Sequence, residues 1–562
     1  MMTAPFARIV AATAGCAALS LSLLVVPAAA QTSPDVQPKM GGTFRMTALP
    51  EPTTLNAYFS GDISVKLLDN LNLEGLAHVA PDGSFVPALA AEIPTQANGD
   101  VSPDGTVVTW KLKSGVLWSD GEPFTSQDVV FTYRMLMDPA NPVIDRSDYR
   151  AMKSVLAPDD MTVVVTYNQL YAPYRLAFPR IFPAHVFNGR TNIADDPFNQ
   201  FPNVTTGPFA LTAAATADSI SYVRNARFRE PGKPYLDEVV VRFTPSRDVA
   251  MQTLQAGEAD ADYALDPSYL SQLATMSDVA VDPAPSSVFQ LFMNESCPTG
   301  PQQGDPSCQH PILGDLRVRQ AIDMAIDKQS LALGLMQGAV QSTGSLLPAG
   351  TYKVDLPGGV FNPEGARRLL DQAGWTVGPD GVRARNGVRA HLSITSVIGN
   401  RLVEQTVQVI ESNLQDVGIE TEGKGSTVGV LSGGFATNSP FSLGNFDLAV
   451  FMRTIPVDPQ SYLFTQFASV QVPTPQMPGQ NWDRVQDPRI DQVLAAAAST
   501  LDDTQRQADY ASLSQLIQSD EAVIPLFPNL QVDARKNYVE GWGPTNVNEP
   551  VTWNVQDWWL NQ

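Results

Sequence analysis

The stretch from Thr106 to Met137 carries the densest pattern in the chain. Val108, Trp110 and Leu112 alternate with polar residues, the period of two that is typical of a half-buried strand. The dipeptide Ser114-Gly115 then turns the chain. The sequence therefore predicts a strand that ends at this turn.

A helix is predicted directly after the strand. Thr125 and Asp128 have the spacing of a capping box, in which each side chain accepts a hydrogen bond from the backbone of the other residue. Apolar residues follow at helical spacing: Val129, Val130, Tyr133, Leu136 and Met137. The stretch is thus predicted to fold as strand, turn and helix.

The same stretch resembles the signature of the dipeptide/oligopeptide class (family 5) of extracytoplasmic solute-binding proteins. The resemblance rests on WKLKSGV at 110–116, WSDGEP at 118–123 and Asp128-Val129, which follow one another without a gap. It identifies a family and says nothing about the ligand.

Further blocks resemble the same family in the same order and extend the resemblance over roughly residues 41 to 545. They include GGTFRM at 41–46, TGPF at 206–209, the segment 225–262, DLRVRQA at 315–321 and the helix that ends near Trp375.

Alternating strands and helices are also predicted in the second half of the chain. Asp315–Leu333 has apolar residues on one helical face, and Leu402–Val417 is a second amphipathic helix. The strand His391–Val397 precedes it, and the apolar run Phe446–Phe451 is predicted to be a central parallel strand. This alternation favours an α/β architecture.

A chain of 562 residues is too long for one compact core, and 45 prolines with 39 glycines indicate many loops and short strands. The resemblance implies an α/β, bilobal, periplasmic-binding-protein-like fold with an extra subdomain in the first lobe, of the large peptide-binding type. The expected divisions are a leader at 31–40, lobe I at 41–285 with a subdomain inserted at about 60–185, lobe II at 286–520, and a return to lobe I at 521–562.

Residues Met1–Ala30 have the composition of an export signal. Arg8 precedes an apolar run at Leu19–Val26, and small residues at Ala28–Ala30 provide a cleavage site. No later segment approaches the ~18 consecutive apolar residues that would suggest a membrane span. We therefore expect a periplasmic or extracytoplasmic protein; a lipoprotein cleaved before Cys16 is the alternative.

Cleavage after Ala30 would leave two cysteines, Cys297 and Cys308, in a loop rich in proline and glycine. In an oxidising compartment they are expected to form a local disulfide, with two free thiols as the alternative. Four histidines in the whole chain supply no clustered partner for a zinc site, so no metal site is expected.

The formal charge of −22, from 58 acidic and 36 basic residues, argues against nucleic acid as a partner, because phosphate neutralisation needs basic patches. The acidic excess is interpreted as a solvated surface that keeps an exported protein soluble.

No catalytic constellation and no cofactor site is predicted. The segment Gly418–Lys424 imitates a phosphate-binding loop, but Gly425 stands where a serine or threonine would hold magnesium. Asp260, Asp262 and Asp266 lack the glycine and the terminal glutamate of a calcium loop. A binding role is therefore expected in place of an enzymatic one.

The resemblance implies a site for the ligand amine: in peptide-binding relatives, an acidic residue after the central strand of lobe II pairs with it. Asp458 and Pro459 match part of that element, but Ile455 or a neighbour replaces the amine-binding aspartate. Arg453 in the same loop favours an acidic or hydroxyl-rich ligand instead. The candidate ligand-binding residues are Asn56, Tyr58, Arg401, Arg453, Asp458, Asn481 and Trp482.

Structural alternatives remain open for three of these residues. Asn56 has the character of a turn-capping residue, Arg401 that of a solvated surface charge, and Trp482 that of a packed aromatic side chain.

The resemblance implies the exported, monomeric substrate-capturing subunit of an ABC importer, which works with permease subunits and a cytoplasmic ATPase. Two hinged lobes would close on the solute, foremost a short peptide. Oligosaccharides, opine-like compounds and metal chelates are alternatives within the family. An exported hydrolase, a chaperone or a chemosensory receptor are alternatives from other classes.

Overall fold

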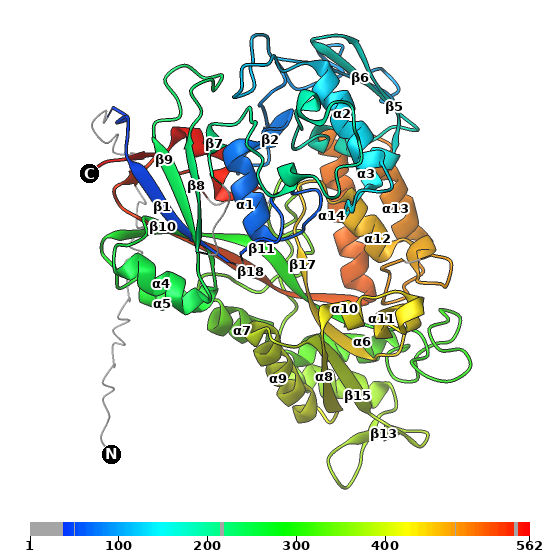
Figure 1. Ribbon diagram of the computed structural model, residues 1–562. Coiled ribbons are helices and arrows are strands. Elements are labelled where there is room, and N and C mark those ends of the chain that lie inside the picture. The colour runs from blue at the N-terminus through cyan, green and yellow to red at the C-terminus, as the bar shows by residue number, and fades with distance from the viewer. Residues whose placement is uncertain (1–36, 50, 214–217, 478, 545–548) are drawn as a thin grey trace, which may run out of the picture. The chain divides into compact units, whose positions relative to one another are not determined.

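A ten-stranded sheet forms the framework of the computed structural model (Figure 1), which describes residues 37–49, 51–213, 218–477, 479–544 and 549–562. Across the sheet, the strands are β16 (Glu420–Ser426), β15 (His391–Val397), β17 (Leu448–Thr454), β11 (Val279–Met293), β18 (Val523–Lys536), β10 (Ala261–Leu265), β1 (Thr43–Ala48), β9 (Glu238–Phe243), β8 (Ser219–Arg224) and β7 (Phe209–Leu211).

The middle of this sheet is antiparallel. Strand β11 pairs antiparallel with β17 and β18, and β18 pairs antiparallel with β10. Parallel pairs flank this centre, with β1 between β9 and β10 on one side and β15 between β16 and β17 on the other. The strand expected at Phe446–Phe451 is β17. It pairs parallel with β15, as predicted, but it pairs antiparallel with β11 on its other side.

Strands β11 and β18 are the two long strands of the sheet and run side by side through its middle (Figure 1). Their pairing extends from Val279 opposite Lys536 to Phe292 opposite Val523. Four prolines interrupt the supply of backbone N–H donors along this pair, and the register shifts at Pro285/Ser287 and Phe289/Gln290. The prolines are Pro283, Pro285, Pro525 and Pro528.

The strand and helix predicted from the signature stretch are confirmed. The strand is β4 (Val107–Lys111), which joins β6 (Thr162–Tyr167) and β5 (Met152–Asp159) in a separate three-stranded sheet. The helix is α2 (Ser126–Met137), and Thr125 and Asp128 form the predicted capping box. Fully buried Trp110 and Trp118 pack in the core of this region.

Fourteen α-helices lie in the described part of the chain. They are α1 (Ile63–Asn72), α2, α3 (Ser147–Arg150), α4 (Arg247–Gln255), α5 (Leu270–Leu273), α6 (Leu316–Ala325), α7 (Lys328–Leu335), α8 (Pro363–Gln372), α9 (Arg401–Asp416), α10 (Val428–Leu431), α11 (Pro440–Leu443), α12 (Gln460–Phe467), α13 (Pro488–Ala498) and α14 (Asp503–Asp520). Within these described segments, no helix combines the length and the apolar character that crossing a bilayer requires.

The single helical segment expected at Asp315–Leu333 is two helices, α6 and α7. The chain leaves helical geometry at Ile326, and the Asp327 side chain then accepts a hydrogen bond from the Ser330 N–H and caps α7. The aspartate competes with the continuing helix for this backbone donor, which explains the break.

Small sheets complete the secondary structure. They are β2 (Ala77–Val79) with β3 (Phe85–Pro87), the sheet of β12 (Thr376–Val377), β13 (Arg383–Arg385) and β14 (Val388–Arg389), and β19 (Val539–Glu540) with β20 (Trp559–Leu560). The C-terminal tryptophans pack on the first strand: the Trp542 and Trp558 rings are stacked 4.3 Å apart, and Phe44 lies 5.1 Å from Trp558.

Residues Lys39–Gln562 form one compact unit with four apolar core clusters. The predicted divisions at 41–285, 286–520 and 521–562 stay a prediction. The expected export signal at 1–30, including Cys16, lies outside the described residues, as does most of the leader. In the loop after β11, the Cys297 and Cys308 sulfurs lie within bonding distance, and their Cα atoms are 5.4 Å apart.

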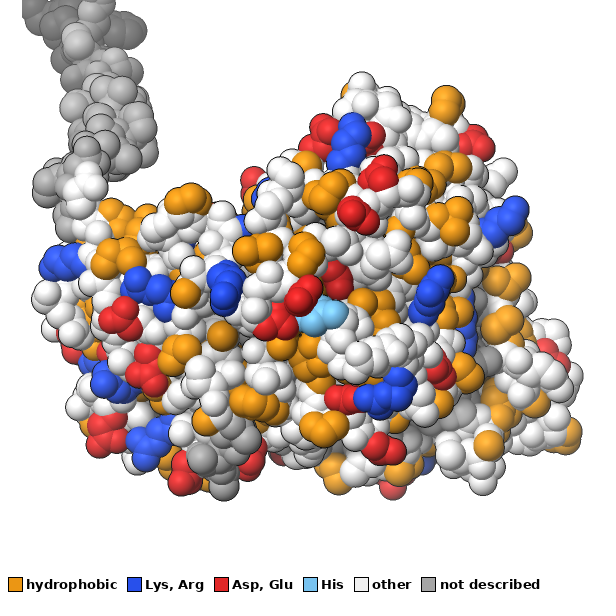
Figure 2. All heavy atoms as spheres, turned by 45° about the horizontal axis from the view of Figure 1, so that its top comes forward, with side chains coloured by type: hydrophobic (Ala, Val, Ile, Leu, Met, Phe, Trp, Pro, Cys, Tyr) orange, Lys and Arg blue, Asp and Glu red, His pale blue; other side chains and the backbone are white. Residues whose placement is uncertain are grey.

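Charged side chains of both signs are interspersed over the face that Figure 2 shows, with no continuous basic patch on that face.

Candidate ligand-binding site

A recess of about 290 Å³ lies over the antiparallel middle of the ten-stranded sheet, and we call it the central recess. Its walls come from α1, from the strands β10, β11, β17 and β18, and from a C-terminal segment. The lining residues are Gly61, Ile63, Lys66, Tyr263, Ser286, Ser287, Thr454, Gln531, Glu549 and Pro550.

Local sequence explains why polar side chains line this recess. The apolar run of β17 ends at Met452, and the strand closes with Arg453 and Thr454. The next residue, Ile455, donates its N–H to the Ser286 carbonyl at 3.1 Å. The register shift in β11 falls between Pro285 and Ser287. The Ser287 hydroxyl accepts a hydrogen bond from the Asn529 amide at 3.3 Å. Strand ends and a bulge therefore present hydroxyl groups where a regular apolar strand would not.

The central recess contains two charged side chains with different surroundings. Glu549 accepts hydrogen bonds from the Val79 N–H at 2.8 Å and from the His78 ring at 3.2 Å. Burial favours the neutral acid, but the interactions with His78 outweigh it and lower the pKa of Glu549. Lys66 makes no ion pair or side-chain hydrogen bond with any residue that the structure describes.

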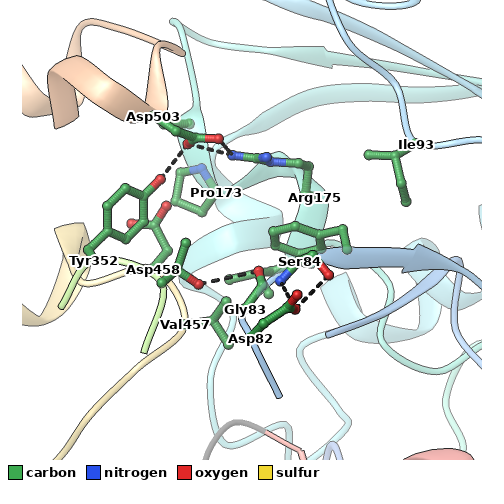
Figure 3. A pocket seen from close by; sticks show the side chains of 14 residues that line it. Asp82, Gly83, Ser84, Ile93, Pro173, Arg175, Tyr352, Val457, Asp458 and Asp503 are labelled. Carbon is green, nitrogen blue, oxygen red and sulfur yellow. Dashed lines mark hydrogen bonds and ion pairs between the residues drawn. The ribbon is translucent and has the colours of Figure 1, made fainter. Parts of the chain in front are cut away.

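A second recess, of about 380 Å³, lies between the loops around 82–93 and 172–176 on one side and residues near 351, 458 and 503 on the other (Figure 3). We call it the bridging recess, because polar contacts cross it. The Arg175 guanidinium contacts both carboxylate oxygens of Asp503, at 2.8 and 3.0 Å. The Tyr352 hydroxyl donates to Asp503 at 2.5 Å, and Thr351 donates to the Gly83 carbonyl at 3.3 Å.

A fully buried arginine, Arg506, contacts two of the residues that line this recess. The Arg506 guanidinium pairs with Asp458 at 2.7 Å and also donates to the hydroxyls of Tyr352 at 2.6 Å and Tyr510 at 2.7 Å. Asp458 accepts a further hydrogen bond from the Gln460 N–H at 3.0 Å. Arg175 and Asp458, which line the bridging recess, thus each have an oppositely charged partner within the protein.

Two of the predicted site residues, Arg453 and Trp482, lie together. The Arg453 guanidinium carbon is 4.3 Å from the Trp482 ring centroid, and its Nη1 donates to the Gln480 amide oxygen at 3.1 Å. Nε and Nη2 of Arg453 are buried and have no hydrogen-bond partner among the described residues. Burial lowers the pKa of this guanidinium.

The other predicted residues have structural surroundings. The fully buried Asn481 amide donates to the backbone carbonyls of Ala468 and Val485. Asn56 donates to the Asn199 side chain at 2.8 Å. Tyr58 donates to the Arg180 carbonyl at 2.7 Å. Arg401 is exposed in the first turn of α9.

None of the seven predicted residues lines the central recess, and Asp458 lines the bridging recess. The sequence did contain a signal for part of the central recess: Ser286 and Ser287 follow Pro285 near the expected crossing between lobes, and Thr454 lies two residues after an apolar run that ends at Met452. It contained no comparable signal for Lys66, which is a polar residue on an amphipathic helix.

In the described parts of the chain, no three His, Cys, Asp or Glu side chains gather as potential metal ligands. The lining of the central recess contains hydroxyl and amide groups, the Lys66 ammonium group, which has no ion-pair partner among the described residues, and the Glu549 carboxylate, which His78 and the Val79 N–H already contact.

Known proteins resemble this chain over almost its whole length. Protein XP55 of Streptomyces lividans is 28% identical over 484 residues, which is 84% of this chain and 80% of that protein. The oligopeptide-binding protein AppA of Bacillus subtilis is 24% identical over 544 residues, or 93% and 92% of the two chains.

Solved structures resemble the fold as well. The structure of AppA in complex with a nonapeptide matches with a TM-score of 0.71 and 22% identity, over 94% of this chain and 100% of that chain. The periplasmic EDTA-binding protein EppA matches with a TM-score of 0.78 and 18% identity, over 94% and 98%. The α/β binding-protein fold predicted from the sequence is thereby confirmed.

The family resemblance inferred from the signature stretch is tested directly by a sequence model of the family. The model for "Bacterial extracellular solute-binding proteins, family 5 Middle" matches residues 84–473, which is more than half of the chain. This chain belongs to the bacterial extracellular solute-binding proteins of family 5.

Proposed function

We propose that this protein is the extracytoplasmic solute-binding subunit of an ABC importer. It acts as a monomer, captures a solute in the central recess, and delivers it unchanged to permease subunits that a cytoplasmic ATPase drives. It performs no catalysis of its own. The fact that the matched relatives with a printed ligand are binding proteins supports this role.

The observation that carries the proposal is the composition of the central recess. Ser286, Ser287 and Thr454 come from the segment proposed as lobe II, whereas Lys66 and Gln531 come from the segments proposed as lobe I. A solute bound there contacts both halves at once. Its binding energy therefore favours a closed arrangement over an open one, and a membrane partner can recognise the closed arrangement.

A short peptide is the ligand class that we favour. The hydroxyl and amide groups of the recess can donate and accept hydrogen bonds, which suits a peptide main chain of any sequence. The name of AppA and its nonapeptide complex point to the same class. A chelate such as that in the name of EppA, an oligosaccharide and an opine-like compound are the alternatives.

Two features outside the lining of the recess also belong to the proposal. Arg453 and Trp482 remain candidate ligand contacts, because Nε and Nη2 of Arg453 are buried without hydrogen-bond partners among the described residues. Cys297 and Cys308 are proposed to be disulfide-bonded in the exported protein, as their close approach suggests. Intact-mass measurement before and after reduction checks the disulfide.

Native mass spectrometry of the protein, purified without refolding, tests the function. We expect a bound solute that leaves on unfolding with its covalent structure intact. Thr454→Trp, at an exposed position of the central recess, should abolish its retention by filling the recess. Thr376→Trp, at an exposed position of β12 outside both recesses, is the matched control and should retain the solute.

Two results contradict the proposal. One is covalent change of the solute during incubation with the pure protein. The other is equal retention of the solute by the Thr454→Trp and Thr376→Trp variants, because the solute would then be bound elsewhere.

A further inference from the structure

The ammonium group of Lys66 is the feature of the central recess that the fold does not account for. Lys66 projects from the first turns of α1, between the buried residues Val65 and Leu67, and Leu67 packs in an apolar core cluster. Its side chain keeps contact with solvent and lines the recess. No carboxylate lies within ion-pair distance of it in the described parts of the chain.

The acidic side chains nearby are engaged with other partners. Asp69, on the next turn of α1, pairs with Arg180 at 2.5 Å. Glu549, on the recess wall, is held by His78 and the Val79 N–H. Arg180 in turn adds positive potential near Lys66, so that burial and this neighbouring cation both lower the pKa of Lys66.

The remaining polar groups of the recess are neutral. They are the hydroxyls of Tyr263, Ser286, Ser287 and Thr454 and the amide of Gln531. Lys66 is therefore the lining group that can distinguish an anionic solute from a neutral solute of the same shape. A partly desolvated ammonium group that lacks an internal partner gains most from a carboxylate oxygen, because a hydrogen bond between charged groups is roughly twice as strong as one between neutral groups.

We propose that Lys66 binds a carboxylate group of the solute and makes the central recess selective for carboxylate-bearing ligands. This inference rests on the proposed function, since it assumes that the solute occupies this recess. The carboxylate can be the C-terminus of a peptide or the acid group of a sugar acid, and both present the same two oxygens to Nζ. In either case, Lys66 is a specificity-determining residue.

The test uses four pools of probes: short synthetic peptides with free C-terminal carboxylates, the same peptides as C-terminal amides, sugar acids, and the corresponding neutral sugars. The protein is first freed of endogenous solute by unfolding and refolding, and bound probes are read by native mass spectrometry. The wild type should retain the carboxylate members of at least one pair of pools about 10- to 100-fold more strongly than their neutral counterparts.

Three variants make the test specific. Lys66→Met keeps the aliphatic stem and should abolish this preference, whereas Lys66→Arg keeps the positive charge and should preserve most of it. Lys153→Met is the matched control, because Lys153 is likewise exposed and has no ion pair with a described residue, but lies on β5 outside both recesses. It should behave like the wild type.

The outcomes separate this inference from the function on which it rests. Equal binding of charged and neutral probes, a preference that survives in Lys66→Met, or no binding from any pool would overturn the role of Lys66. The proposed function is tested separately, by whether the natively purified protein retains a solute and releases it chemically unchanged. Preference for the peptide pool or the sugar-acid pool identifies the source of the carboxylate.

Discussion

The two recesses of this protein are similar in size but differ in how their charges are satisfied. In the bridging recess, Arg175 and Arg506 each pair with an aspartate of the same chain. In the central recess, the Lys66 ammonium has no such partner among the residues that the structure describes. The first arrangement holds parts of the protein together, and the second leaves a charge available to a solute. We therefore expect that the pairing of lining charges within the chain indicates which cavity binds a ligand better than the cavity volume does.

The largest effect is expected from removing the buried charge beneath the bridging recess. Arg506→Met leaves the nearly buried Asp458 without its cation. Breaking one side of such a pair typically costs about 3–5 kcal/mol, so the free energy of unfolding should fall by that order. Urea denaturation measures it. The double variant Arg506→Met/Asp458→Asn removes the stranded charge as well and should recover part of the loss. A loss below about 1 kcal/mol would show that this pairing is not structural.

A carboxylate introduced into the central recess should make it resemble the bridging recess. Thr454→Asp adds an acidic group to the wall that Lys66 shares, and Thr454→Asn adds the same shape without charge. The aspartate should weaken binding of carboxylate-bearing peptides by about tenfold relative to the asparagine, or about 1.4 kcal/mol. Titration calorimetry with one such peptide measures the ratio. If the two variants bind alike, the recess is not selective for charge.

The recesses should also respond to opposite ends of the pH scale. The pKa of Lys66 lies below its ordinary value of 10.5, so carboxylate binding should weaken as pH rises through this lowered pKa, before pH 10.5 is reached. Binding isotherms across the alkaline range check this. Lys66→Arg should remain pH-independent there, because guanidinium stays protonated. An identical alkaline profile for wild type and Lys66→Arg would assign the titration to another group.

Asp503 in the bridging recess behaves in the opposite way. Burial alone would raise its pKa, but hydrogen bonds from Arg175 and Tyr352 lower it below the ordinary 3.8. The pair therefore contributes stability above the unfolded-state pKa of 3.8 and loses it as pH falls through the lower folded-state value. Denaturant titrations of wild type and Asp503→Asn should converge in acid and remain separate at neutral pH. Constant separation down to acidic pH would contradict this assignment.

The smallest effect belongs to the Arg175–Asp503 ion pair. The two side chains are 21% and 46% exposed, so solvent screens their attraction. A double-mutant cycle with Arg175→Met and Asp503→Asn should give a coupling energy of roughly 0.2–1 kcal/mol. A coupling energy of several kcal/mol would show that this partly exposed ion pair stabilises the protein as much as the buried Arg506–Asp458 pair does.

Much of the fold could be predicted from the sequence because its signals are local. The capping box at Thr125 and Asp128 and the alternation around Trp110 depend on residues a few positions apart, and the structure has both. The antiparallel pairing of β11 with β17 could not be predicted, since it joins residues more than 150 positions apart in the sequence. The single helix predicted at Asp315–Leu333 was wrong, because Asp327 caps a second helix there although the apolar face continues past it.

The candidate site was harder to predict because a ligand-facing residue has no local signature. Asp458 matched a family element, yet the structure pairs it with Arg506, forty-eight positions later. Lys66 belongs to an ordinary amphipathic helix, and what distinguishes it is its place on the wall of the central recess without an ion-pair partner among the described residues. Whether a charge is paired is a property of the folded chain, and it becomes visible only when segments distant in sequence meet.

The position of β18 in the sheet has a consequence for how the protein is made. This strand is contributed by residues 523–536 and fills the place between β10 and β11, which are synthesised some 250 positions earlier. Until the ribosome has produced it, both neighbours expose an open edge, and such edges favour aggregation. The nascent chain can therefore complete its native ten-stranded sheet only after nearly all of it has been translated.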